Sequence, residues 1–184
     1  LELAGEDDAF AAREAACAAT AVESVAPGLP TARGVDPDRL RTLAYTHRAS
    51  RLLGRCDAAI DAARALVDAA AVDRTGTVAV RARDVRGTAG VDTRRAEREL
   101  GSELVDSGFD VELDHPDHEL RACFAGDTCL VGWLVAESVR DYGDRRPTDR
   151  PFLQLGSMDV GDARALVNLD GAEPGATIAD PMCG

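Results

Sequence analysis

The C-terminal residues carry the pattern with the clearest chemical meaning. Residues 177–180 are a β-prone stretch that ends in Asp180, and the turn that follows stops at Gly184. In α/β proteins, a strand, an acidic residue and a glycine-bearing turn form the first corner of a nucleotide-type cofactor site. The glycine lets the backbone approach the ligand, and the carboxylate accepts hydrogen bonds from it. Asp180 and Gly184 are therefore candidate cofactor-binding residues, with an ordinary strand-end turn as the alternative.

Residues upstream of this corner belong to the same candidate site. Residues 150–158 include Phe152 and the run Gly156, Ser157 and Met158, and residues 163–169 are a predicted helix. Without the later corner, this run would be an ordinary helix N-cap followed by a core methionine. A cofactor corner needs a parallel sheet, and the sequence ends before one can form. We therefore expect the chain to be the front part of a longer enzyme.

Arginines form the second group of residues with a chemical meaning. Residues 77–85 are the clearest predicted strand, on which Arg81 and Arg83 share one half-exposed face. Arg86 follows in a loop, and Arg94 begins a predicted helix over residues 94–106. Because a guanidinium group can hold a phosphate through two parallel hydrogen bonds, these arginines predict an RNA-binding surface. Aromatic residues make up only 4% of the chain, so contacts to RNA shape and backbone are expected rather than base stacking.

The arginines of the predicted helix have an alternative interpretation. Arg94, Arg95 and Arg98 could pair with the neighbouring acids on a solvated helix face. Arg81, Arg83 and Arg86 are harder to explain by ion pairing, because strand and loop hold them together.

Cysteine and histidine residues give no sign of a metal site or a disulfide framework. The five cysteines are odd in number, and none is in a C-x-x-C pair. We interpret them as small core residues in a reducing compartment. His115 and His118 with Cys123 could suggest zinc, but the acidic run around them is more typical of a solvated connection between strands.

Composition limits the function classes. Acidic residues number 33 against 21 basic residues, all of them arginine, which gives a net charge of −12. This balance excludes generic nucleic-acid binding at ordinary salt, DNA included, because phosphate contacts come from cations. It fits a salt-adapted, halophile-like cytoplasm with a GC-rich genome, or GC bias alone. No signal peptide or membrane span is recognisable, so a soluble cytoplasmic protein is expected.

The remaining pattern predicts an α+β chain. Ala-rich helices are expected over residues 10–25 and 58–71, a possible strand over residues 40–45, and a short Arg-rich helix over residues 49–53. A hairpin is expected from strands over residues 119–124 and 128–135. A polar linker follows over residues 141–150.

Three stretches together resemble the archaeal tRNA (guanine(10)-N2)-dimethyltransferase family. These are residues 1–7, residues 78–83 followed by 96–101, and, most specifically, residues 150–158 and 163–169 leading to 180–184. The resemblance implies a ferredoxin-like domain (residues 1–71), a THUMP RNA-binding domain (72–140), a linker (141–150), and the truncated start of a Rossmann-like methyltransferase (151–184). Leu155 and Val160 depart from the family pattern, which usually has proline there, and Leu153 stands where an aromatic residue is common.

The resemblance also implies a function. The whole protein would transfer a methyl group from S-adenosylmethionine to the exocyclic amine of a tRNA guanine, as a monomer that holds the tRNA acceptor end. Asp180 and Gly184 would line the methionine end of the cofactor, and Phe152, Gly156, Ser157 and Met158 would flank it. The family's catalytic motif, an acidic or amide residue followed by two prolines and an aromatic residue, is absent from these 184 residues, so they should be inactive alone. The alternatives are a non-catalytic tRNA-binding module and a related THUMP enzyme that modifies another base or ribosomal RNA.

Overall fold

The structure is a computed structural model that describes residues 1–70, 75–142, 157–172 and 175–179. Its elements in chain order are β1 (Glu2–Leu3), α1 (Asp8–Ala15), β2 (Ala21–Ala26), β3 (Leu29–Arg33), α2 (Pro37–Leu40), β4 (Thr46–Asp57), α3 (Ile60–Ala69), β5 (Thr77–Asp84), the 3-10 turn η1 (Val85–Gly87), α4 (Thr93–Asp106), β6 (Asp110–Val111), β7 (His118–Ala125), β8 (Thr128–Glu137) and α5 (Val160–Leu169).

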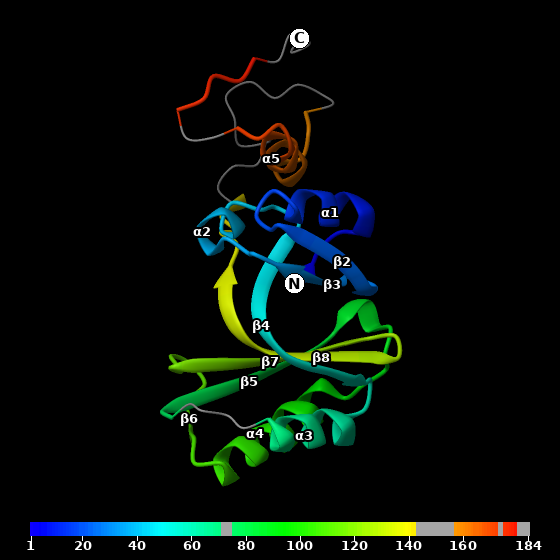
Figure 1. Cartoon of the computed structure of the whole chain (residues 1–184), viewed down its shortest axis with the longest axis vertical. Helices are drawn as coiled ribbons and strands as arrows, with labels where there is room; N and C mark the ends of the chain where they lie inside the picture. The colour runs from blue at the N-terminus through cyan, green and yellow to red at the C-terminus, as the bar shows by residue number, and fades with distance from the viewer. Residues whose placement is uncertain (71–74, 143–156, 173–174, 180–184) are drawn as a thin grey trace.

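A mixed sheet of the order β1-β4-β8-β7-β5-β6 forms the centre of the described structure, and β2 and β3 form a separate hairpin. β5 is parallel to β6 and β7, whereas the pairs β1–β4, β4–β8 and β7–β8 are antiparallel. β4 and β8 are long, and β4 curves from the N-terminal elements into the layer of β5 and β7 (Figure 1). Two irregularities of register in β4, at Ala49/Ser50 and at Leu52/Gly54, accompany this bend.

Helices α3 and α4 cover one face of the sheet (Figure 1). Asp92 caps the N-terminus of α4, and its carboxylate accepts a hydrogen bond from the Arg95 amide. The main hydrophobic cluster lies between these helices and strands β5, β7 and β8, and its fully buried members include Ala63, Leu100 and Phe124. The opposite face of the sheet is turned toward the N-terminal elements.

The N-terminal elements are held together by a buried carboxylate. Glu14 of α1 is 0% exposed and accepts hydrogen bonds of 2.7 Å from the amides of Ala44 and Tyr45, just before β4. A buried charge is tolerated only where hydrogen bonds satisfy it, and these bonds fix α1 against the start of β4.

The α+β class expected from the sequence is confirmed, together with most of the expected elements from residue 58 to residue 137. α3, β5, α4 and the hairpin of β7 and β8 lie where the pattern predicts them. The predicted boundary between residues 71 and 72 separates α3 from β5, although Val67 and Val78 belong to the same cluster. The division into two domains stays a prediction.

The helix expected over residues 10–25 is confirmed only as far as Ala15, whereas the helix over residues 49–53 and the strand over residues 40–45 are wrong. α1 ends at Ala15, and residues 21–26 form β2, which turns at Gly28 (φ 72°) and pairs with β3. Residues 37–40 are α2, and residues 46–57 are β4. In residues 21–26 and 46–57, pairing with another strand outweighs the helix propensity of alanine and arginine.

The expected C-terminal strand is also not observed in the part that the structure describes. Residues 177–179 lie outside any strand, and no strand next to them is present among the described residues. Asp180 and Gly184 lie outside the described residues.

Gly132 of β8 is required by the bend of β4. A Cβ atom at this position would lie 2.6 Å from the Arg51 carbonyl oxygen and 3.2 Å from the Leu52 Cα. Both atoms belong to the backbone of β4, so neither can move without disturbing the strand pairing.

We expect Gly132→Ala to lower the free energy of unfolding by about 1–3 kcal/mol, because the added methyl group pushes β4 away from β8. The matched control is Gly101→Ala in α4, where a Cβ atom would meet nothing within 4 Å. The control should raise stability by up to about 1 kcal/mol through helix propensity. Denaturant unfolding measures both variants, and a Gly132→Ala variant as stable as the wild type would contradict this account.

Candidate nucleic-acid interface

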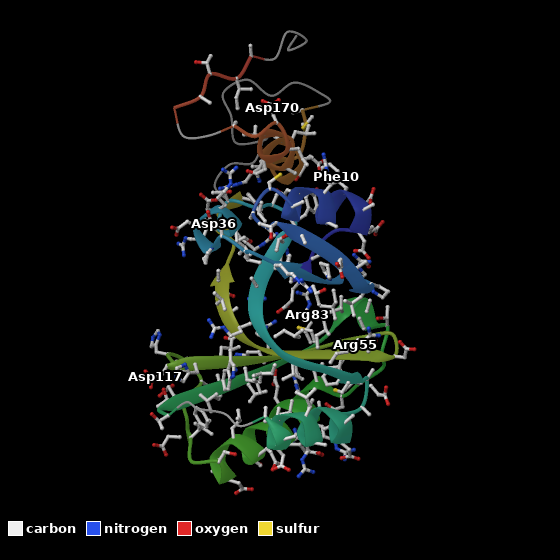
Figure 2. The ribbon with its side chains drawn as sticks, in the orientation of Figure 1. Phe10, Asp36, Arg55, Arg83, Asp117 and Asp170 are labelled. Carbon is white, nitrogen blue, oxygen red and sulfur yellow. The ribbon has the colours of Figure 1, made fainter. Side chains whose placement is uncertain are left out.

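Three arginines of β5 and β7 belong to the face of the sheet that is turned toward the N-terminal elements. Arg81 and Arg83 are two residues apart on β5, and Arg121 of β7 lies directly opposite Arg81. Arg83 lies between the sheet and the N-terminal elements (Figure 2). The expectation that Arg81 and Arg83 share a face thus extends to a third guanidinium, on the neighbouring strand.

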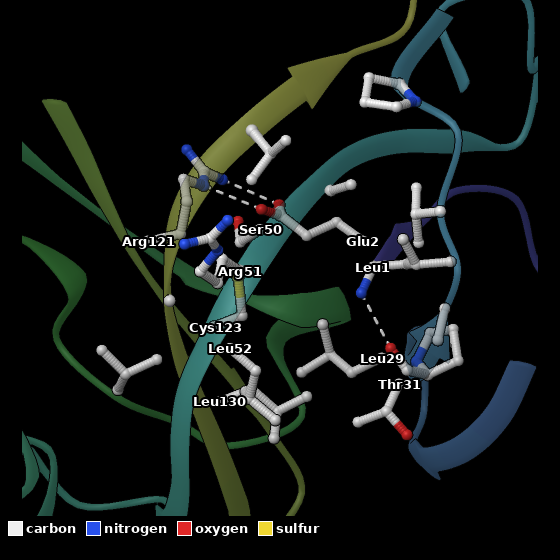
Figure 3. A pocket seen from close by; sticks show the side chains of 18 of the residues that line it. Leu1, Glu2, Leu29, Thr31, Ser50, Arg51, Leu52, Arg121, Cys123 and Leu130 are labelled. Atoms are coloured by element: carbon white, nitrogen blue, oxygen red, sulfur yellow. Dashed lines mark hydrogen bonds and ion pairs between the residues drawn. The ribbon is translucent and has the colours of Figure 1, made fainter. Parts of the chain in front are cut away.

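Arg121 forms a buried ion pair with Glu2. Its Nε and Nη2 atoms each donate a 2.8 Å hydrogen bond to a different oxygen of Glu2 (Figure 3). Nη1 donates to Glu119 at 3.0 Å. The two side chains of the pair are only 7% and 5% exposed. Arg83 approaches the same Glu2 carboxylate at 3.6 Å. Glu2 therefore joins β1 to the middle of the sheet.

This pair lowers the pKa of Glu2 and raises the pKa of Arg121, so each side chain keeps its charge over a wider pH range. Burial alone would raise the pKa of Glu2, but the hydrogen bonds and the charge of Arg121 outweigh burial and hold that pKa below its ordinary value of 4.5. Burial also acts to lower the pKa of Arg121, and the Glu2 carboxylate raises it above its ordinary value. Both groups remain charged at neutral pH.

A cleft of about 480 Å³ opens beside the ion pair, between β3, β4 and the adjoining strands (Figure 3). Leu29 and Leu130 contribute to an apolar wall, and the buried Cys123 thiol lies next to Arg121, with its pKa raised to about 12 by burial. Arg51 is an exposed lining residue, and its side chain has no acidic partner among the described residues.

Arg86 connects the sheet to the N-terminal segment. Its backbone has a left-handed φ of 56°, and its Nη2 atom donates to the Gly5 carbonyl at 2.9 Å and to Asp8 at 2.6 Å. Asp8 also accepts a 2.9 Å bond from the Gly28 amide, so three segments meet at one carboxylate. Much of the Arg86 charge is therefore already neutralised within the protein.

A second hollow, of about 800 Å³, lies along α4 beside β5. Arg94 and Arg98 line it from successive turns of α4, and Arg81 lines it from β5, with its Nη2 atom 2.6 Å from the Leu113 carbonyl oxygen. Arg94 and Arg98 are exposed and have no ion-pair partner in the part of the chain that the structure describes. We call Arg81, Arg94 and Arg98 the α4 arginine group.

The arginines of α4 differ in whether an acidic side chain already binds them. Arg95 lies outside the hollow and forms an ion pair with Glu99 at 2.6 Å. The predicted ion pairing on a solvated helix face is therefore observed for Arg95, but not for Arg94 and Arg98 among the described residues. Glu97 and Asp106 also line the hollow, and the Glu97 carboxylate accepts a bond from the Ala82 amide. The sequence pattern indicated Arg98 only as an ion-pairing residue. Its spacing of four residues from Arg94 places both on one helix face and could have identified it.

The candidate cofactor residues are described only in part. Ser157 and Met158 lie at the approach to α5 and are exposed, Met158 by 52%, whereas Phe152, Gly156, Asp180 and Gly184 lie outside the described residues. Two exposed side chains cannot enclose a ligand the size of a nucleoside. The described residues therefore do not by themselves form the cofactor site.

Helix α5, which follows these residues, is docked on the N-terminal elements. Asn168 donates to Glu14 at 2.7 Å, Arg164 donates to the Thr42 carbonyl at 2.6 Å, and Tyr45 donates to Asp162. The bond to Asp162 raises the pKa of Tyr45 to about 12. Glu14 therefore holds α5 as well as the start of β4.

Neither a metal site nor a disulfide is found among the described residues. Within them, no group of three or more His, Cys, Asp and Glu side chains could hold a metal ion. The described cysteines, Cys17, Cys56, Cys123 and Cys129, are all free thiols. None of the helices that the structure describes is long and apolar enough to cross a membrane.

Comparisons with known proteins show similarity to curated enzymes of one name from two archaeal species. The chain is 35% identical over 147 residues to a tRNA (guanine(10)-N2)-dimethyltransferase of Methanothermobacter thermautotrophicus, a match that covers 78% of this chain and 43% of the relative. It is 30% identical over 99 residues to the enzyme of the same name from Methanocaldococcus jannaschii, covering 53% of this chain and 28% of the relative. The chain thus spans less than half the length of the curated relatives it matches. No family model matches the chain.

Solved structures give weaker similarities. One is a 4-thiouridine synthetase in complex with RNA and ATP, with a TM-score of 0.47 and 15% identity over 74% of this chain and 39% of that one. Another is TrmN from Thermus thermophilus, with a TM-score of 0.45 and 19% identity over 64% of this chain and 38% of that one. These scores are too low to identify a shared function.

Removal of one partner of the buried ion pair is expected to destabilise the fold. Arg121→Met removes both hydrogen bonds to the buried Glu2 carboxylate and leaves only the more distant Arg83 charge beside it. This loss should lower the free energy of unfolding by about 3–5 kcal/mol. Denaturant unfolding at neutral pH tests this. A loss below about 1 kcal/mol would show that Glu2 does not depend on Arg121.

The same pair predicts a pH dependence. Because the folded protein lowers the pKa of Glu2, its stabilising contribution is complete above the unfolded value of 4.5 and is lost as pH falls through the folded value. The stability deficit of Glu2→Gln should therefore be largest at neutral pH and shrink below about pH 4.5. Glu23→Gln, at an exposed position of β2, is the control and should show a small difference at every pH.

Proposed function

Because the chain belongs to the tRNA (guanine(10)-N2)-dimethyltransferase family, we propose that it is the tRNA-binding part of a methyltransferase that acts on the exocyclic amine of a tRNA guanine. The match over 147 residues is the observation that carries this proposal. S-adenosylmethionine, when bound, would supply the methyl group. The residues of this chain would bind and orient the RNA, and residues 72–140 would form the THUMP domain that holds the acceptor end.

The α4 arginine group is the part of the surface best suited to RNA phosphates. Arg94 and Arg98 are exposed and free of acidic partners within the described residues, so RNA can bind them without first breaking an ion pair. Arg81 is tied to a carbonyl oxygen rather than to a carboxylate and keeps its charge available. Arg83 and Arg86 would contribute less, because Glu2 and Asp8 already take up part of their charge.

Helix α5 supports a fixed placement of the catalytic region relative to the RNA. By the family resemblance, α5 immediately precedes the first methyltransferase strand. Its bonds to Glu14 and Thr42 attach it to the N-terminal elements. The long strands β4 and β8 connect these elements to the part of the sheet that α4 covers. The distance from the bound RNA to the start of the methyltransferase would thus be set by packed elements. Accurate positioning of the base is most of what such a methyl transfer requires.

The proposal predicts that Arg94→Ala and Arg98→Ala each weaken tRNA binding. If each arginine binds one phosphate, each variant should also make the slope of log affinity against log salt shallower by roughly one. Arg95→Ala is the matched control, because Arg95 lies on the same helix but is paired with Glu99. Filter binding or fluorescence anisotropy over a salt series measures these effects. If all three variants behave alike, net charge and not this surface determines binding.

The 184-residue chain alone is predicted to bind S-adenosylmethionine weakly or not at all and to leave tRNA unmethylated. It lacks the double-proline catalytic motif, and Ser157 and Met158 are exposed instead of lining a pocket. Titration calorimetry and a methyl-transfer assay on a tRNA transcript test both statements. Tight cofactor binding by this chain would contradict the assignment of the cofactor site.

A further inference from the structure

Two free thiols, away from the α4 arginine group, face each other on neighbouring strands. Cys56 of β4 and Cys129 of β8 are directly opposite in the antiparallel register, so their side chains project to the same face of the sheet. Directly opposite residues have Cα atoms about 4.5 or 5.5 Å apart, depending on the hydrogen-bonding pattern. Both separations lie within the range of about 4.4–6.8 Å that disulfides span.

The two thiols differ in their access to solvent. Cys129 is 0% exposed and belongs to the main hydrophobic cluster. Cys56 is partly exposed and borders a small hollow of about 290 Å³, which Arg55, Asp57, Asp127 and Thr128 also line. Arg55, the residue before Cys56, lies near the end of the curved strand β4 (Figure 2). A small oxidant can therefore reach Cys56 directly and reach Cys129 only through it.

Hydrogen bonding gives the two sulfurs different chemical roles. The hydrogen bond with Cys129 lowers the pKa of Cys56, against the effect of burial. The same bond, followed by burial, raises the pKa of Cys129. Thiolate character therefore concentrates on the exposed sulfur, which is the arrangement of a reactive cysteine beside a resolving one.

We propose that Cys56 and Cys129 are a modification site that a peroxide converts to a reversible intrachain disulfide. The Cys56 thiolate attacks one peroxide oxygen, the O–O bond breaks, hydroxide leaves, and Cys56 becomes a sulfenic acid. The Cys129 thiol then attacks that sulfur, the S–O bond breaks, and the S–S bond forms as its proton and the leaving hydroxyl depart as water. Two thiols together lose two electrons, and hydrogen peroxide is reduced to two molecules of water. A dithiol reductant reverses the reaction.

The other described cysteines lack this arrangement. Cys123 is buried and lies opposite Leu130, and burial raises its pKa to about 12. Cys17, after α1, has its Sγ atom 3.9 Å from the Arg13 carbonyl oxygen, and burial is the first cause of its raised pKa. Both serve as internal controls.

The test treats the full 184-residue chain with a small excess of hydrogen peroxide, blocks the remaining thiols, and maps the peptides by mass spectrometry. The expected product is a peptide pair linked through Cys56 and Cys129 that dithiothreitol separates. Cys17→Ser and Cys123→Ser variants should form the same link, whereas Cys129→Ala should stop at a Cys56 sulfenic acid that dimedone traps. Oxidation should raise the midpoint of thermal unfolding of the wild type and leave that of Cys56→Ser unchanged.

The wild-type peptide map decides the outcome even if a variant folds poorly. Sulfinic or sulfonic acid at Cys56 without a linked peptide would overturn the proposal, and so would a link through Cys17 or Cys123. This outcome is independent of tRNA binding and methyl transfer.

Discussion

The arrangement of the described structure depends on one buried ion pair at the point where the N-terminal elements meet the sheet. Glu2 and Arg121 are joined by two hydrogen bonds of 2.8 Å in surroundings that leave both side chains almost without solvent. Such a pair adds little stability compared with apolar residues of the same volume, because both charges lose their hydration. It does penalise any arrangement that separates the partners. We therefore interpret it as a device that fixes how β1 lies against the sheet.

The bend of β4 works with this pair. β4 leaves the N-terminal elements, crosses Gly132 at backbone contact distance and continues beside β8 as far as Thr128. Without a side chain at Gly132, the two strands can approach where β4 is irregular. The curve encloses the cleft that contains the ion pair, so the same constraint produces the joint and the hollow beside it.

Arginine has two different uses in this acidic chain. Arg86 and Arg121 are taken up by carboxylates that connect separate segments, and their loss would disturb the fold. Arg94 and Arg98 have no such partner among the described residues and present their charge to solvent. With a net charge of −12, general attraction to nucleic acid is absent. The proposed binding to tRNA would then depend on a few arginines that have no acidic partner in the described structure.

The sequence by itself determined the features that local signals specify. The strand β5, the helix α4 and the hairpin of β7 and β8 follow from alternation, helix-forming residues and turn residues that lie close together in the chain. The family was also recognisable, because its motifs are short and contiguous. Only the tertiary structure decided that residues 21–26 and 46–57 are strands, because strand pairing outweighs alanine's preference for helix and β8, the partner of residues 46–57, is distant in the chain. Only the tertiary structure also decided which arginines are paired with carboxylates, because an ion pair such as Glu2 with Arg121 joins residues that no local pattern connects.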